Sequence, residues 1–127
     1  MPLNVQIDEN QQVIFVRGEG IVTDQELLDY VREYLGDSRY NIYDELIDLT
    51  EADLQDLTYA GLSELASVVA ATDPEAIPIK IAILISQSLG MGLSRIYSRL
   101  REFKGGRRQT RVFWDRDECM EWLGLIP

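Results

Sequence analysis

The chain has 127 residues and a mass of 14.5 kDa, and 46% of its residues are hydrophobic, which suits one folded domain with its own core. It carries 12 Lys and Arg, 22 Asp and Glu and no histidine, so its formal net charge is −10. The missing histidine argues strongly against Ser-His-Asp or Cys-His nucleophiles and removes the commonest zinc ligand. The acidic balance opposes binding to nucleic acid through an overall electrostatic field.

The single cysteine, Cys119, cannot form a disulfide within the chain or a CxxC pair, and it fits a reducing compartment. The first twelve residues contain neither a basic segment nor an apolar one that would indicate a signal peptide. No apolar stretch approaches the ~18–20 residues of a membrane span. We therefore expect a cytoplasmic protein without a membrane span.

A β-hairpin is predicted at the N-terminal end of the chain. Val5 and Ile7 alternate with polar neighbours, a polar turn follows over residues 9–11, and residues 13–16 form a second apolar run. This pattern is typical of two paired strands. We expect Gly18 and Gly20 to end the second strand.

A helix is predicted to begin at the capping box formed by residues 23–26, in which a hydroxyl and a carboxylate satisfy free amide groups. Gly36 is expected to end this helix in the left-handed conformation. The apolar residues within 46–49 predict a short strand. A second helix is expected from about residue 57 to the Thr-Asp-Pro sequence at 72–74.

The apolar run over residues 77–85 is interrupted only by Pro78 and Lys80, which predicts a strand buried on both faces in the middle of the sheet. An amphipathic helix of about four turns should follow, because five apolar residues recur at spacings of four and three. We expect this helix to bury that stripe. The stripe consists of Leu89, Leu93, Ile96, Leu100 and Phe103.

The last predicted elements are a short strand over residues 111–114 and a helix capped by Asp115 or Asp117. Cys119 lies on the inward stripe of that helix, so we expect a small core residue and not a nucleophile. Strands that alternate with helices predict an α/β fold. The expected architecture is a mixed five-stranded sheet with an N-terminal β-hairpin and about four helices.

This order of elements, together with three local patterns, resembles the SpoIIAA-like family, which is related to STAS domains. The patterns are DELIDLT over residues 44–50 followed by TYAGL over 58–62, the strand over 80–85, and the ending over 111–123. The resemblance implies a single SpoIIAA-like, STAS-like domain over residues 1–127. The fold also looks similar to CRAL-TRIO lipid-transfer domains, in which helices shield an apolar ligand.

In STAS anti-sigma factor antagonists, a partner kinase phosphorylates a serine in an Asp-Ser-Ser-Gly-Leu turn at a helix start. When Gly61 and Leu62 are matched to the end of that motif, Thr58, Tyr59 and Ala60 occupy the Asp-Ser-Ser positions. The usual phosphoacceptor is therefore missing, and the kinase switch is not carried over. Thr58 and Tyr59 still carry hydroxyls that phosphorylation could use, but a helix cap is the favoured interpretation of Thr58.

The turn over residues 86–92 is the first candidate ligand site, because it follows the most buried strand and opens a helix. Its sequence, SQSLGMG, matches neither a Walker A loop nor the dinucleotide motif GxGxxG. A plain strand-to-helix turn with a serine cap is the alternative. With the helix start at residues 58–62, the candidate ligand residues are Thr58, Tyr59, Gly61, Ser86, Ser88, Gly90 and Gly92.

Positive charge is concentrated in one region. Residues 95–116 hold 8 basic and 2 acidic side chains, whereas residues 1–94 hold 4 basic and 17 acidic ones. This asymmetry predicts a surface for an anion, an acidic partner or a second copy. A solvated helix face is the alternative interpretation. The candidate surface residues are Arg95, Arg99, Arg101, Lys104, Arg107 and Arg108.

These observations favour a non-catalytic interaction module that binds a protein partner or itself, with a homodimer as a natural consequence. The alternative is a carrier or sensor of a small apolar or anionic ligand, either lipid-like or nucleotide-like. An enzyme is less favoured because no activating base accompanies the available hydroxyls. We expect no cofactor and no metal, since the acidic residues over 44–56 do not follow EF-hand spacing.

Overall fold

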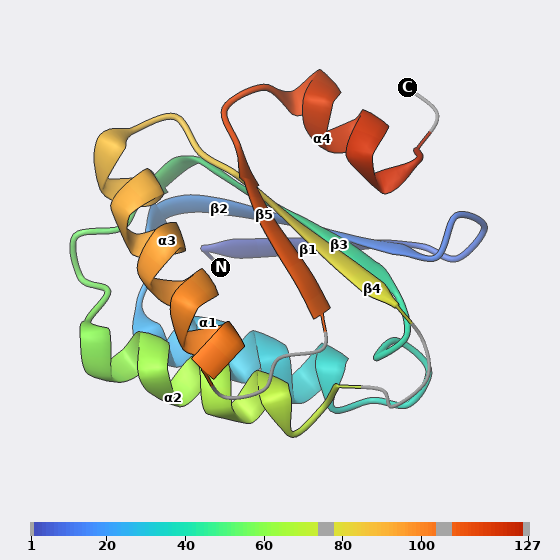
Figure 1. Cartoon of the computed structure of the whole chain (residues 1–127), viewed down its shortest axis with the longest axis horizontal. Coiled ribbons are helices and arrows are strands. Elements are labelled where there is room, and N and C mark those ends of the chain that lie inside the picture. Colours follow the sequence, from blue (N-terminus) through green and yellow to red (C-terminus); the bar gives the residue numbers. More distant parts are fainter. Residues whose placement is uncertain (1, 74–77, 104–107, 126–127) are drawn as a thin grey trace.

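The structure is a computed structural model that describes residues 2–73, 78–103 and 108–125. Five strands form one mixed sheet in the order β1-β2-β3-β4-β5 (Figure 1). The first two pair antiparallel as the predicted hairpin, and the others run parallel to β2. The strands are β1 (Leu3–Asp8), β2 (Val13–Ile21), β3 (Asp44–Asp53), β4 (Ile79–Leu84) and β5 (Arg108–Phe113).

Four α-helices surround the sheet in the described part of the chain, which agrees with the predicted α/β layout. Figure 1 shows α1, α2 and α3 on one face of the sheet and α4 on the other. Each face has its own apolar cluster, the larger one beneath the first three helices. The helices are α1 (Asp24–Tyr30), which a π-helical segment η1 (Val31–Leu35) continues, α2 (Tyr59–Ala70), α3 (Ser88–Phe103) and α4 (Arg116–Leu123).

Most helix starts follow the predicted capping chemistry. Thr23 and Glu26 form both halves of the capping box at α1. Asp115 caps α4, and its side chain accepts a hydrogen bond from the backbone N–H of Asp117. No helix in the described ranges is long and apolar enough to cross a bilayer.

The glycine predictions were wrong at two points. β2 does not stop at Gly18 but continues to Ile21, and a Cβ at position 18 would lie 3.2 Å from the Cβ of Ala52 on β3. Glycine therefore permits close strand packing there. Gly36 has φ −78°, in the right-handed region, because a π-helical turn ends the helix. A left-handed stop is not needed.

The middle strand of the sheet is β3, not β4 as predicted. β4 is nevertheless an interior strand between β3 and β5, and all of its residues except Lys80 are buried. β3 extends from Asp44 to Asp53, well beyond the short strand that its apolar residues predicted. Polar residues interrupt and flank its apolar ones, so apolar runs alone underestimated its length.

Candidate functional site

The helix α3 buries a different face from the predicted one. The residues it buries are Gly90, Ser94, Tyr97 and Arg101. Among the predicted stripe, Leu93 and Leu100 are only partly buried. The remaining members are exposed, at 44% for Leu89, 38% for Ile96 and 88% for Phe103. At about 100° per residue, the buried row lies about a third of a turn from the apolar stripe, so the predicted inward face was wrong.

Buried polar contacts determine which face of α3 points toward the interior. Nη2 of Arg101 lies 2.8 Å from both carboxylate oxygens of Asp73, and Nη1 donates to the carbonyl of Ala66. At the other end of the helix, a Cβ at Gly90 would be only 3.1 Å from Cγ2 of Ile85. The row that contains Gly90 and Arg101 faces inward for two reasons. Arg101 has buried acceptors, and Gly90 allows α3 to approach Ile85, the residue after β4.

The predicted basic surface was wrong for two of its arginines. Arg101 is 2% exposed and Arg108 is 4% exposed. Nη1 of Arg108 lies 2.6 Å from Oδ1 of Asp73, and Nη2 donates to the carbonyl of Asn41. Both cations belong to an interior cluster and are unavailable to an external anion. Position along the chain did not distinguish them from arginines on the solvent side.

The rest of the predicted surface is smaller than expected. Arg95 and Arg99 are exposed on α3. Lys104 and Arg107 lie outside the described residues. The described part of this surface therefore consists of two arginines beside the exposed apolar row of the same helix.

An open groove separates the exposed sides of α2 and α3. Tyr59 and Ser63 line it from α2, and four α3 residues line the other side. Tyr59 is 65% exposed. Aromatic and aliphatic groups therefore face solvent from two adjacent helices. The α3 residues are Ile96, Arg99, Leu100 and Phe103.

The predicted ligand residues of the 86–92 turn form no large pocket together. Oγ of Ser86 donates to the carbonyl of Thr50, and Ser88 is exposed at the start of α3. Ser86 and Gly90 line a recess of about 10 Å³, near the minimum for one water molecule. A Cβ at Gly92 would meet open space.

The strand order explains why this turn lacks a crevice. In open α/β sheets, ligands bind at the point where the order of strands reverses. The order here runs from β1 to β5 without reversal, and the crossover helices α1, α2 and α3 share one face. The turn follows a buried strand but does not lie at a switch point.

The other predicted ligand residues lie at the start of α2. Oγ1 of Thr58 accepts a hydrogen bond from the backbone N–H of Gly61 and donates to Oδ2 of Asp24 at 2.7 Å. The backbone N–H of Thr58 donates to the other oxygen of Asp24. The interpretation of Thr58 as a cap is confirmed. Tyr59 faces the groove with α3 and lies apart from the recess beside Ser86.

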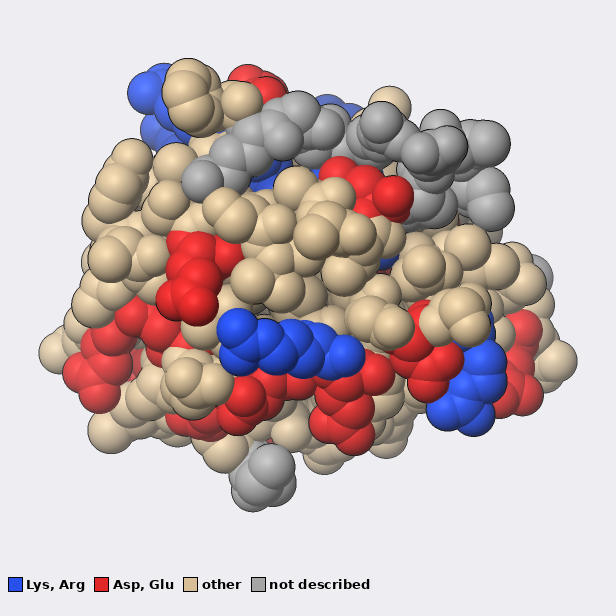
Figure 2. Space-filling view, turned by 90° about the horizontal axis from the view of Figure 1, so that it is seen from below, with Lys and Arg blue, Asp and Glu red and all other residues tan. Residues whose placement is uncertain are grey.

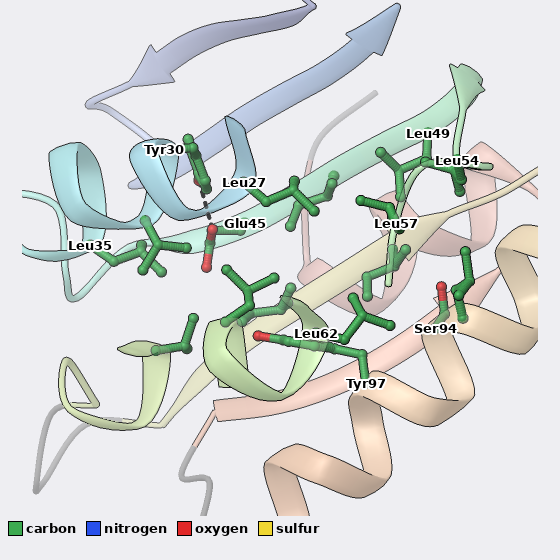
Figure 3. Close-up of a pocket in the computed structure, with 17 residues that line it drawn as sticks. Leu27, Tyr30, Leu35, Glu45, Leu49, Leu54, Leu57, Leu62, Ser94 and Tyr97 are labelled. Carbon is green, nitrogen blue, oxygen red and sulfur yellow. Dashed lines mark hydrogen bonds between the residues drawn. The ribbon is translucent and has the colours of Figure 1, made fainter. Parts of the chain in front are cut away.

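A mostly apolar cavity of about 80 Å³ lies between the sheet and the first three helices (Figure 3). Leu27 of α1, Leu62 of α2 and Ile47 of β3 contribute to its walls. Its few polar lining groups come from Tyr30, Glu45, Ser94 and Tyr97. None of these polar residues was among the predicted site residues.

Glu45 is the most unusual residue of this cavity, because its carboxyl group is 1% exposed. Oη of Tyr30 donates to its Oε1 at 2.6 Å, the bond drawn in Figure 3. Oε2 has no hydrogen-bond partner in the described part of the chain. Alternation along β3 could have revealed its position, since Glu45, Ile47 and Leu49 fall on the same face of the strand.

Burial governs the ionisation of the polar groups in the cavity. It raises the pKa of Glu45 above its usual value, against the Tyr30 hydrogen bond and the charges of Arg108 and Arg101. Burial and the Glu45 carboxylate raise the pKa of Tyr30 well above 10, so this phenol remains a neutral donor. Burial likewise raises the pKa of Tyr97.

The remaining sequence candidates have structural roles. Cys119 is fully buried and packs with Phe113 and Leu123, which confirms its predicted core position. Burial raises the pKa of its thiol to about 11, far from the range of a reactive thiolate. Within the described residues, no group of three or more His, Cys, Asp and Glu side chains is arranged to hold a metal ion.

No protein-family model matches this chain, and no curated protein matches it.

Proposed function

We propose that the chain is a non-catalytic, STAS-like interaction module that forms a homodimer through α2 and α3. The observation that carries this proposal is the apolar row of α3, of which three members, Leu89, Ile96 and Phe103, face solvent. An amphipathic helix normally buries such a row. A helix that exposes it leaves an apolar surface for another molecule to cover.

The groove between α2 and α3 continues this apolar surface. Tyr59 and Phe103 flank it from opposite helices, and they are 65% and 88% exposed. On α2, Ala60 and Ser67 are small and exposed, so a second helix can approach closely. Exposed aromatic anchors beside small residues favour helix-on-helix docking.

The charges favour a second copy of this chain as the occupant. Arg95 and Arg99 are exposed on α3, while Glu64 is exposed on α2. A two-fold axis through the groove would lay α3 of one copy over α2 of the other, so that each Arg99 approaches Glu64 of the other copy, although within its own chain Glu64 lies 3.8 Å from Arg32 of η1 and does not line the groove. Figure 2 shows acidic side chains in a band across the face seen from below. The net charge of −10 opposes an anionic membrane or nucleic acid, and it also repels a second copy, so the proposed interface needs this local pairing of opposite charges.

Sedimentation equilibrium tests the proposal. We expect the wild-type protein to have twice the 14.5 kDa chain mass at micromolar concentrations. Ile96→Ser should weaken the dimer by roughly tenfold or more, because it places a polar group in the apolar contact. The matched control is Trp114→Ser, which changes a 54% exposed aromatic that does not line the groove.

The pattern of results separates the hypotheses. A dimer that Ile96→Ser weakens and Trp114→Ser leaves intact supports the proposal. A monomeric wild type, or a dimer equally insensitive to both substitutions, contradicts it. If the wild type is monomeric, vesicle flotation would test whether a lipid surface covers the apolar row instead.

A further inference from the structure

We infer that the cavity beneath α1, α2 and α3 binds a small apolar molecule that carries one hydrogen-bond donor, with Glu45 as the acceptor. The donor is a hydroxyl or an amine on a short aliphatic chain. This site is separate from the α2–α3 groove, because the two share no lining residue. No residue of the predicted 86–92 turn lines it, although the recess beside Ser86 shares Leu49 and Leu54 with the cavity.

The walls of the cavity determine the apolar part of the ligand. Side chains such as Leu27, Leu49, Leu57 and Leu62 converge from the helices, the sheet and the loop before α2 (Figure 3). An apolar cavity of about 150 Å³ is large enough for benzene. A cavity of about 80 Å³ therefore suits a ligand with about three to five heavy atoms.

Glu45 determines the polar part of the ligand. Oε1 is occupied by the hydrogen bond from Tyr30, while Oε2 has no partner in the described residues and its carboxyl group lines the cavity. A buried acceptor without a partner is costly, so a donor in the cavity would gain a strong hydrogen bond. Arg101 and Arg108 lower the pKa of Glu45 against the larger, opposite effect of burial, and the proposed site needs the carboxylate form, which accepts and does not donate.

The same carboxylate excludes other ligand classes. An anionic head group, such as a carboxylate or a phosphate, would be repelled within a cavity of low polarity. A purely apolar ligand would fill the space but leave Oε2 without a partner. The chemistry therefore selects a neutral alcohol or a protonated amine.

Two isomers of the same size provide the probes. 1-Butanol has a hydroxyl donor, whereas diethyl ether has the same atoms and only an acceptor. In NMR titrations of the full chain at pH 8, 1-butanol should cause saturable shifts of the Leu62 and Leu65 methyl signals. We expect it to bind roughly tenfold more tightly than the ether. 1-Butylamine distinguishes the two donors, because tighter binding than 1-butanol identifies the amine.

The variant Glu45→Gln should remove this preference. Its amide oxygen can keep the hydrogen bond from Tyr30, which turns the NH₂ group toward the cavity. The cavity would then offer a donor that the oxygen of either isomer can accept, so 1-butanol should lose its advantage over diethyl ether. Ser94→Leu fills the cavity while Glu45 remains, and it should abolish the binding of both probes. Ile96→Ser, which lies outside the cavity lining, should leave both affinities unchanged.

The proposal is overturned if 1-butanol produces no saturable shift of the cavity methyl signals in the folded wild type. It is also overturned if the wild type binds the two isomers equally or prefers the ether. If Glu45→Gln does not fold, the donor preference of the wild type and its loss in Ser94→Leu still decide the result.

Discussion

The carboxylate of Asp24 fills the space in which a Cβ atom at position 61 would stand. Asp24 begins α1 and Gly61 lies in the first turn of α2, so this contact joins the starts of two helices. The same carboxylate accepts two hydrogen bonds from Thr58. Glycine at position 61 is therefore a requirement of this junction and not of the helix itself.

Gly61→Ala is expected to lower the free energy of unfolding by about 1–3 kcal/mol, because the new methyl group displaces the Asp24 carboxylate. In an Asp24→Ala background the space is free, and alanine favours a helix over glycine by about 1 kcal/mol. There the same substitution should be neutral or stabilising. Urea denaturation of the four proteins completes this double-mutant cycle, and equal effects in both backgrounds would contradict the overlap.

Asp73 links Arg101 of α3 to Arg108 of β5 within the interior, at 2.8 Å and 2.6 Å. Asp73→Asn leaves two buried cations without this counter-charge, so we expect a loss of about 3–5 kcal/mol in the free energy of unfolding. The exposed pair of Arg32 and Glu64, at 3.8 Å, is the control. Arg32→Ala should cost less than about 1 kcal/mol in the same chemical denaturation series. Similar losses for both variants would show that the Asp73 cluster contributes no more than a surface pair.

The stability of the protein should depend on the ionisation of Glu45. Burial raises the pKa of this group in the folded state above the ordinary value of 4.5. Its stabilising contribution is then fully present below about pH 4.5 and is lost as the pH rises through the folded-state pKa. Glu45→Gln cannot ionise, so its stability relative to the wild type should increase as the pH rises from 4.5.

Urea midpoints measured between pH 4 and pH 8 check this difference. The exposed Glu118→Gln variant on α4 serves as the control, and its difference from the wild type should vary less with pH. A difference between Glu45→Gln and the wild type that stays constant over the range, or decreases with pH, would disprove the expected linkage.

The homodimer proposal predicts a charge-exchange effect. Arg99→Glu and Glu64→Arg each place like charges opposite one another across the proposed two-fold interface, so each should weaken the dimer by several-fold. The double variant restores opposite charges and should recover most of the affinity. Sedimentation equilibrium at low and moderate salt measures the dimer dissociation constants of these three variants. Failure of the double variant to recover would exclude this pair from the interface.

Local chemistry made parts of this fold predictable. The hairpin and the helix caps depend on residues close in sequence, and both Thr23 and Thr58 act as the caps that their positions indicate. The buried β4 was recognisable from its continuous apolar run, although its place beside β3 was not. Strand order depends on long-range packing, which a local pattern does not encode.

The orientation of α3 could not be predicted from spacing alone. The row with Leu89 and Ile96 and the row with Gly90 and Arg101 both follow helical periodicity. The second row faces the interior because Arg101 forms an ion pair with Asp73, 28 positions earlier in the chain. Glu45 was overlooked for a related reason, since its partner Tyr30 lies on another element and only the fold brings them together.

Because the two rows of α3 face in different directions, the packing of the interior and the apolar surface of the helix are encoded at separate positions. Substitutions at residues 90, 94, 97 and 101 alter the interior, whereas those at 89, 96 and 103 alter only what the surface presents. The outer row is therefore free to diverge without loss of the scaffold. Chains that share this architecture could acquire new binding specificities through as few as three positions.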